Sequence, residues 1–307
     1  GGAQPTLDVR AGVSPEALGE PPLELLTVFN NNTVDAFTGN AFVTGEPSSA
    51  DITIGDVSMN AVDSLVLLTS NYESNDNLEG GDITITGEGN FGLGINARNF
   101  IGTGGTVFID ARGNLNAINS SIQTTALTEV GDIVLLAGET VRFDGADGSR
   151  TTGAFASIAA GGEDSTGGTV RINAANLEVL NGAQIASSVF GNGQGGDVLF
   201  NIRETARFDG VNPITGLSSS GAFSSVNPGG EGTGGNVQLS ASNLEVTNGA
   251  ALTASTFGIG DAGDVILTIT ETARFDGVNP ITGLSPSGAF SSVNPGGEGT
   301  GGNVQLS

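Results

Sequence analysis

The chain has 307 residues, a formal net charge of −24 and a pI near 4.1, and it contains no Cys, no His and no Lys, so all nine basic residues are Arg. These absences exclude Ser-His-Asp triads, Cys-His dyads, Schiff-base or phosphate-loop lysines and His/Cys zinc sites. The acidity argues against nucleic acid as a partner. The longest apolar run, at residues 65–68, is too short to cross a bilayer, so we expect no membrane insertion.

The first fifty residues are the least regular part. Residues 5–12 (PTLDVRAG) contain one candidate strand, and residues 15–32 form a Pro- and Asn-bounded excursion before ADITIGDV begins at residue 50. We therefore expect residues 1–50 to be an irregular N-terminal part of the same domain, with a loop excursion. The chain starts without Met or an apolar leader and stops in a strand-like pattern, so we expect both ends to be cuts through a longer protein.

From residue 51 to 307 the chain is repetitive. A marker Gly, followed by Asp, Asn or Thr and then by alternating apolar residues, recurs at intervals of 24, 26, 37, 28, 39, 28 and 39 residues. The markers are Gly81, Gly105, Gly131, Gly168, Gly196, Gly235, Gly263 and Gly302. A short and a long coil alternate from residue 131, giving a period of 67 residues. Residues 204–240 recur as 271–307 with Ser219 replaced by Pro286. Such periodicity is typical of stacked repeat architectures.

Each interval holds three short runs with period-two alternation, separated by Gly, Asn, Asp or Pro. This pattern predicts strands, and no stretch has helical spacing with caps. Three strands per coil without crossover helices predict an all-β fold, a single-stranded parallel β-helix (solenoid). We expect it to be right-handed, because parallel crossovers within one sheet almost always are.

The alternation assigns inward-facing residues on three faces of each coil, and stacking of the coils ~4.8 Å apart would bury them. The first face is expected to use Ile83/Ile85, Val107/Ile109, Ile133/Leu135, Val170/Ile172, Val198/Phe200, Val237/Leu239 and Val265/Leu267. The second is expected to use Val141/Phe143, Leu177/Val179, Ala206/Phe208, Leu244/Val246 and Ala273/Phe275. The third is expected to use Phe155, Ile185, Phe223, Leu252 and Phe290.

Charged residues alternate along two expected columns. The residue after each marker never repeats Asp in consecutive coils, which would weaken repulsion between stacked carboxylates. That column is Asp82, Thr106, Asp132, Thr169, Asp197, Asn236, Asp264 and Asn303. On the second face an outward structural ladder alternates in sign, through Arg142, Glu178, Arg207, Glu245 and Arg274. We hypothesise that this ladder fixes the order of short and long coils, each pair adding ~0.2–1 kcal/mol.

Two motifs imitate binding sites. Gly87, Gly89 and Gly92 have dinucleotide-fingerprint spacing, but the following Gly-rich segment has no apolar stripe for the required helix. NGQGGDVLF at residues 192–200 resembles one calcium-binding nonapeptide, but such sites need tandem nine-residue turns. We interpret the second motif as a turn before a strand.

Carboxylates and Arg are the groups left for catalysis, and paired carboxylates would suffice for glycoside hydrolysis. The acids nevertheless recur with the coils, as RFDG does at Asp144, Asp209 and Asp276, which favours a role in turns. The long coils also carry loops from Gly145, Gly210 and Gly277, where either binding or tolerated insertion is expected. We therefore expect no catalytic, cofactor or metal site.

The series DVRAG, ADITIGDV, SLVLLTSNY, GGDITITG and GTVFIDARG, followed by TARFDGVN and SGAFSSVNPGGEGTGGNVQLSASNLEVTNGAALTASTFGIGDAGDV, resembles the repeat region of filamentous haemagglutinin-like exoproteins of the cyanobacterial two-partner secretion type. The resemblance covers nearly the whole chain. The family's N-terminal export motifs are not matched, since NPIT at Asn212 and Asn279 lies in repeated loops.

The resemblance implies an extended right-handed β-helix that is exported through an outer-membrane secretion partner and is secreted or displayed at the cell surface. It implies a non-catalytic adhesin or surface filament that provides reach and surface presentation for cell adhesion, with a host-cell, extracellular-matrix or glycan receptor. Two other functions stay open: a β-helix enzyme acting on acidic polysaccharide, and a cation-bridged surface-layer component.

Overall fold

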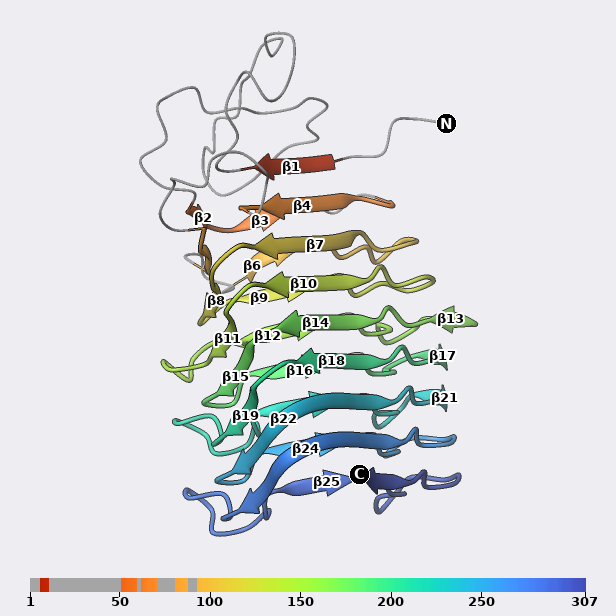
Figure 1. Ribbon diagram of the computed structural model, residues 1–307. Coiled ribbons are helices and arrows are strands. Elements are labelled where there is room, and N and C mark those ends of the chain that lie inside the picture. Colours follow the sequence, from red (N-terminus) through yellow and green to blue (C-terminus); the bar gives the residue numbers. More distant parts are fainter. Residues whose placement is uncertain (1–5, 11–50, 60–61, 71–80, 88–92) are drawn as a thin grey trace, which may run out of the picture.

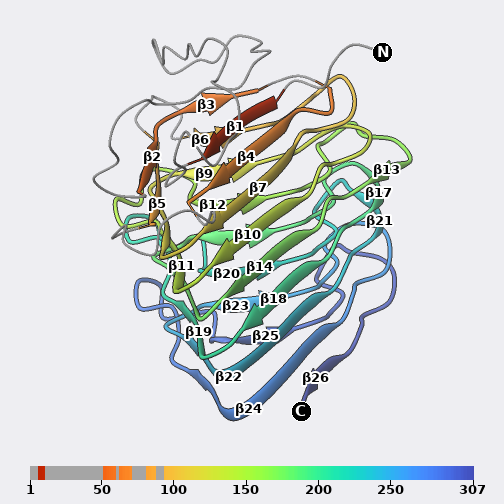
Figure 2. The same ribbon diagram turned by 45° about the horizontal axis from the view of Figure 1, so that its top comes forward.

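The computed structural model of the chain describes residues 6–10, 51–59, 62–70 and 81–307 except 88–92. Within these ranges the regular elements are all strands, and they wind into a right-handed parallel β-helix, as the alternation predicts (Figure 1). The chain turns through three faces and then advances by one coil, so each face is a stack of parallel strands (Figure 2). In the described residues no helix is long and apolar enough to span a membrane.

The first face consists of β1 (Thr6–Arg10), β4 (Leu65–Thr69), β7 (Thr106–Ala111), β10 (Ile133–Ala137), β14 (Val170–Ala174), β18 (Val198–Ile202), the first halves of β22 (Val237–Thr247) and β24 (Val265–Asp276), and β26 (Val304–Leu306). The second face consists of β2 (Ile52–Ile54), β5 (Ile83–Thr86), β8 (Leu115–Ile118), β11 (Thr140–Asp144), β15 (Asn176–Leu180), β19 (Thr205–Asp209) and the second halves of β22 and β24. Because β22 and β24 run unbroken around the corner, the two faces belong to one 15-stranded sheet.

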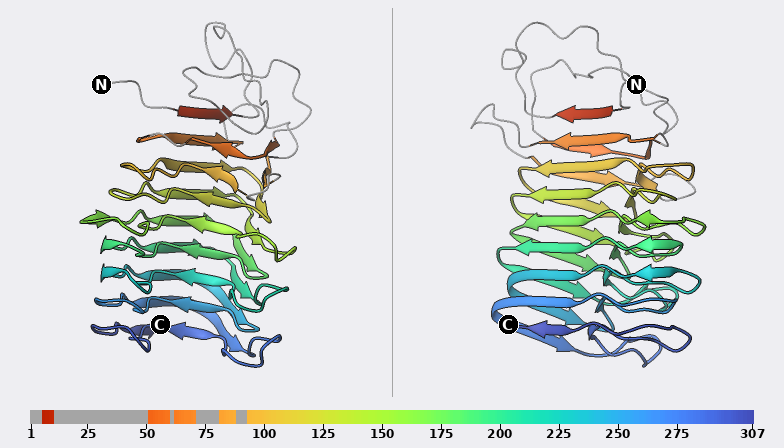
Figure 3. Two further views of the ribbon diagram at one scale, coloured as in Figure 1. Left: turned by 180° about the vertical axis from the view of Figure 1, so that it is seen from behind. Right: turned by 90° about the vertical axis from the view of Figure 1, so that its right-hand side faces the viewer.

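The third face is an 8-stranded sheet of β3 (Val57–Ser58), β6 (Leu93–Asn96), β9 (Ser121–Gln123), β12 (Gly153–Phe155), β16 (Gln184–Ala186), β20 (Gly221–Phe223), β23 (Ala251–Thr253) and β25 (Gly288–Phe290). A 3-stranded sheet of β13 (Ser165–Thr166), β17 (Asn192–Gln194) and β21 (Glu231–Thr233) lies at one edge of the stack. The views from behind and from the side show the coils stacked evenly along one axis (Figure 3).

The alternation of long and short coils begins earlier than the marker glycines predict. Leu65 pairs with Thr106, 41 residues later, whereas Ile83 pairs with Leu115 on the second face. The expected place of Ile83 and Ile85 on the first face is therefore wrong, and Val66 and Leu68 fill it. The marker pattern misassigned β5 because a Gly-Asp turn also precedes this second-face strand. Pairing gives successive coils of 41, 26, 37, 28, 39, 28 and 39 residues.

The other expected first-face pairs are confirmed as core, with every side chain at most 4% exposed from Val107 to Leu267. The second-face pairs from Val141 to Val246 are fully buried as well. Ala273 and Phe275 occupy the same column in the last coil and are exposed, because no described coil covers them. Burial therefore follows the stacking of coils, as expected for strands too short to be stable alone.

On the third face the prediction is right for Ile185 and Leu252, which are fully buried, and wrong for the three phenylalanines. Ala154, Ala222 and Ala289 lie in register with Ile185 and Leu252, so the adjacent phenylalanines point outward. These phenylalanines are Phe155, Phe223 and Phe290. A three-residue strand has too little alternation to fix its register, and a shift of one residue exchanges the faces.

The inward residue of the third face alternates between small and large from coil to coil, through Ala154, Ile185, Ala222 and Leu252. Within a coil, a large second-face residue accompanies a small third-face residue, and the reverse holds in the next coil. The sets are Phe143 with Ala154, Val179 with Ile185, Phe208 with Ala222, and Val246 with Leu252. All eight side chains are fully buried. Because both overfilling and cavities destabilise a close-packed core, we expect the two positions of each set to compensate in size.

The marker glycines form a spine along the corner before the first face. A Cβ added at Gly131, Gly168, Gly196, Gly235, Gly263 or Gly302 would lie 2.0–2.3 Å from the carbonyl oxygen of the preceding marker. Backbone therefore packs directly on backbone at this corner, and only glycine fits. At Gly81 the added Cβ would instead meet Arg112, as its second-face position requires.

In the N-terminal part, β1 pairs with β4 and extends the first face, which confirms the strand expected within residues 5–12. The excursion predicted at residues 15–32 lies outside the described residues. Of the dinucleotide-like motif, Gly89 and Gly92 also lie outside them. The segment after Gly92 forms strand β6, not the helix that a dinucleotide site requires.

Candidate functional site

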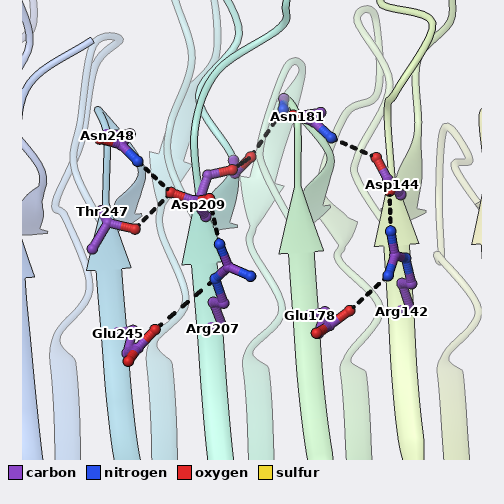
Figure 4. A network of polar contacts seen from close by, with 11 residues as sticks. Arg142, Asp144, Glu178, Asn181, Arg207, Asp209, Glu245, Thr247 and Asn248 are labelled. Carbon is purple, nitrogen blue, oxygen red and sulfur yellow. Dashed lines mark hydrogen bonds and ion pairs between the residues drawn. The ribbon is translucent and has the colours of Figure 1, made fainter. Parts of the chain in front are cut away.

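The five residues of the predicted charge ladder lie in one column across adjacent coils. Arg142 pairs in register with Glu178, Glu178 with Arg207, Arg207 with Glu245, and Glu245 with Arg274. The contacts are grouped in pairs, with Arg142 Nη1 lying 3.1 Å from Glu178 Oε2 and Arg207 Nε lying 3.9 Å from Glu245 Oε2 (Figure 4). That the ladder fixes the order of short and long coils stays a hypothesis.

Each Arg of the ladder also binds the Asp two residues later on its own strand. Arg142, Arg207 and Arg274 contact Asp144, Asp209 and Asp276, respectively. The hydrogen bond to Asp144, with the charges of Asp144 and Glu178, raises the pKa of Arg142 above its ordinary value despite desolvation. The RFDG motif therefore builds an ion pair within the strand, which spacing alone did not predict.

The same aspartates also join coils through an amide that sequence reasoning missed. Asn181 Nδ2 donates to Asp144 Oδ1 at 2.7 Å, and Asn248 Nδ2 donates to Asp209 Oδ1 at 2.8 Å. Thr247 Oγ1 donates to the same Asp209 oxygen at 2.6 Å. Asp144 and Asp209, each in a long coil, are thereby held by the Asn-Gly turn of the following short coil (Figure 4). Asp144 and Asp209 therefore make contacts between coils as well as within their own strands.

The Asp column after the marker glycines also binds the backbone. Asp132, Asp197 and Asp264 each accept a backbone N–H from the next coil at 2.7 Å. Asp82 belongs to a different column, one coil after Asp51, whose Oδ1 accepts the Asp82 N–H at 2.9 Å. The expectation that consecutive coils avoid Asp is therefore wrong here. Each charge is offset by backbone donors, which stabilise a carboxylate.

The loops of the long coils reach one another across the short coil between them. Asn212 Nδ2 donates to Gly148 O at 2.8 Å, and Asn279 Nδ2 donates to Gly216 O at 2.7 Å. Leu217 and Leu284, at equivalent positions of the repeated loop, are 83% and 70% exposed. The loops are thus ordered extensions of the stack that expose apolar side chains.

The nonapeptide-like segment at residues 192–200 contains strand β17 and then β18. A recess beside β17 is lined by Glu163, Asp164, Asn192 and Glu231 together with glycines. Within the described ranges there is no group of three or more acidic, His or Cys side chains placed to hold a metal ion. The turn interpretation is therefore wrong for residues 192–194, which form strand β17, and only residues 195–197 connect it to β18.

A groove on the outside of the first face is the candidate binding site. It has a cavity volume of about 240 Å³ and is lined by side chains of β14, β18, β22 and β24. These four strands lie side by side in the stack of Figure 1. Two outward columns line it, Arg171, Leu199, Gln238 and Ile266 in one and Asn173, Asn201, Ser240 and Thr268 in the other. Backbone pairing in register aligns each column across four coils.

The groove is polar and carries no acid. None of its described lining residues is a carboxylate, although the chain as a whole has 33 acidic residues. In the part of the chain that the structure describes, the Arg171 guanidinium has neither a hydrogen bond nor an ion pair. An unneutralised Arg surrounded by amides and hydroxyls is suited to bind an anionic oxygen ligand.

Sequence analysis missed this groove because it followed inward positions. The signal was present at the outward positions between them. The segments VRIN, VLFN and VQLS each have a polar residue at their fourth position, on the first face of the coil. The run of Asn173, Asn201, Ser240 and Thr268 becomes a surface feature only after the coils are stacked.

The comparisons with known proteins returned no relatives: no family model, no curated protein and no solved structure matches this chain.

Proposed function

We propose that this chain is a non-catalytic repeat segment of a secreted adhesin or surface filament of the filamentous haemagglutinin-like kind, exported by an outer-membrane partner. Its role is to provide reach and to present a surface for cell adhesion. The resemblance of the repeats supports this proposal, and the structural observation that carries it is the unbroken stacking of β1 to β26 along one axis. A solenoid of this kind grows linearly with each added coil.

The spacer role is tested by changing the number of coils. Deleting residues 197–263 removes one 67-residue period, a long and a short coil. Gly196 is then followed by Asp264, which takes the place of the equivalent Asp197. The variant should keep a β-type circular dichroism spectrum and be shorter by about 9.6 Å, the rise of two coils. Small-angle X-ray scattering measures the change in length. Loss of the folded state, or an unchanged maximum dimension, would contradict the proposal.

The adhesive role needs a separate measurement. Beads coated with the chain should attach to cells or to extracellular matrix more strongly than beads coated with the same chain unfolded. Attachment equal to that of the unfolded control would contradict the adhesive role, and it would not affect the spacer role.

The polysaccharide-cleaving alternative is tested with oligogalacturonate. The described groove lining lacks the carboxylate pair that glycoside hydrolysis uses. We expect no new reducing ends or unsaturated ends during prolonged incubation. Their release by the chain, and not by an unfolded sample, would overturn the non-catalytic assignment.

A further inference from the structure

We propose that the first-face groove binds an extended glycan that bears a carboxylate, with Arg171 pairing with that carboxylate and the amide and hydroxyl column binding sugar hydroxyls. This inference deepens the proposed function, on which it rests, by naming the ligand class of the presented surface. It is drawn from the side chains that the stacked coils place together.

The shape of the groove favours a chain-like ligand. Its four strands follow one another in register, so their side chains cover about 14 Å along the helix axis. A volume of about 240 Å³ is smaller than the usual pocket for a compact ligand, and its residues are spread along a sheet surface. A ligand that runs across the strands can contact every coil of this set.

The chemistry of the lining favours hydroxyls and one carboxylate. Asn201, Ser240 and Thr268 are exposed, and Asn173 and Gln238 are half-buried, so donors and acceptors face solvent on all four strands. Such groups can bind sugar hydroxyls in either direction. Leu199 and Ile266 provide apolar surface between them. Arg171 is the first of the four groove residues in its column, beside Val134 of β10, and its exposed guanidinium can make a bidentate contact to a carboxylate.

A peptide fits this surface less well. Peptides that bind sheets usually add a strand at an exposed edge, where backbone groups are unpaired. The strands of the groove are each paired on both sides, β14 with β10 and β18, and β24 with β22 and β26. A ligand on this face must therefore bind through side chains alone, which suits a glycan.

The net charge of −24 repels a polyanion at long range, so the contact must be local. At physiological salt this repulsion is screened beyond about 8 Å, whereas the direct Arg171 contact persists. Binding should therefore be measured at 0.15 M salt, and a free carboxylate on the ligand should be essential.

The test uses a fluorescent hexagalacturonate and its methyl ester, which keeps the hydroxyls and removes the charge. We expect the acid to bind saturably with one site per chain and the ester to bind at least ten-fold more weakly. Arg171→Gln should weaken binding of the acid to the level of the ester. Asn201→Ala should weaken both ligands by several-fold, because it removes a contact to hydroxyls.

Arg203→Gln is the matched control, because Arg203 lies outside the groove, where its Nη2 donates to Gly138 O. It changes the net charge equally and should leave binding unchanged, and urea unfolding should show that Arg171→Gln retains the wild-type stability. The proposal is overturned by absence of saturable binding, by equal affinity for the ester, by equal loss in both Arg variants, or by tighter binding of hexaglutamate. These results would leave the coil-deletion result for the spacer role unaffected.

Discussion

Asp197 and Asn236, 39 residues apart in sequence, are joined by a 2.7 Å hydrogen bond from the Asn236 backbone N–H to the Asp197 carboxylate. The same link follows at Asp264, whose Oδ1 accepts the Asn303 N–H at 2.7 Å. In the coil between them Asn236 Oδ1 accepts the Asp264 N–H at 2.8 Å. A side chain at the start of each coil thus fixes the position of the next coil.

Asp197→Ala should lower the free energy of unfolding by about 1–2 kcal/mol, because a charge-assisted hydrogen bond to a half-buried backbone N–H is lost. Asp197→Asn should lose less than half as much free energy of unfolding as Asp197→Ala, since Asn236 performs the same role in the next coil. Urea unfolding measures both. Glu163→Ala is the control, because the described Glu163 side chain has no hydrogen bond or ion pair, and an equal loss there would contradict the assignment.

Ala154→Ile should destabilise the core by about 1–3 kcal/mol, because the coil already holds the fully buried Phe143. Adding Phe143→Val should recover part of this loss, since the double variant then matches the neighbouring pair of Val179 and Ile185. Thermal or urea unfolding of the single and double variants measures the coupling.

Phe155→Leu serves as the control for this core, because Phe155 points outward in register with Gln123 and Ala186. It should cost less than either single core change. Additive effects of Ala154→Ile and Phe143→Val would show that the two faces do not share volume.

Arg207→Glu should destabilise the chain by roughly 1 kcal/mol, because it places a negative charge between Glu178 and Glu245 in the ladder. The loss should shrink in 1 M salt, where exposed charges are screened. Arg203→Glu, with the same charge change outside the ladder, should have a smaller effect. A loss that does not respond to salt would rule out an electrostatic role for the column.

Thr300→Ala should raise the pKa of Asp261 toward its ordinary value. Thr300 Oγ1 and its backbone N–H donate to Asp261 Oδ1 at 2.7 and 2.9 Å, and the hydroxyl contact is the main cause of the lowered pKa. Because the folded pKa is lowered, this contact stabilises the fold above the ordinary Asp pKa and is lost as the pH falls through the lowered value.

Carboxyl NMR titration of Asp261 measures this change. Asp276 provides an internal control, because its pKa is lowered chiefly by the hydrogen bond and charge of Arg274 and should not respond to Thr300→Ala. An unchanged Asp261 titration would mean that the Thr300 hydroxyl does not lower the pKa of Asp261.

The sequence alone predicts the fold well, because period-two alternation over strands such as β10 and β14 leaves one choice of inward face. It fails where that signal is short or duplicated: at the Gly-Ala-Phe strands, and at Ile83, where a marker turn precedes a second-face strand. The ladder column follows from register and is therefore predictable. The groove and the Asn181–Asp144 contact were missed because they involve outward and turn residues, which the inward alternation does not report.

The near-identity of residues 204–240 and 271–307 has a consequence for folding. Both segments offer the same strand edges and the same core outline, so the edge of β18 can accept either one as its neighbour. Choosing the second copy would leave a 67-residue segment looped out while most native pairings still form. Repeat proteins misassemble by this kind of exchange. The duplication that lengthens the stack thus also creates a competing, nearly native state. That state differs from the correct one mainly in the stacking of the two coils that it leaves looped out.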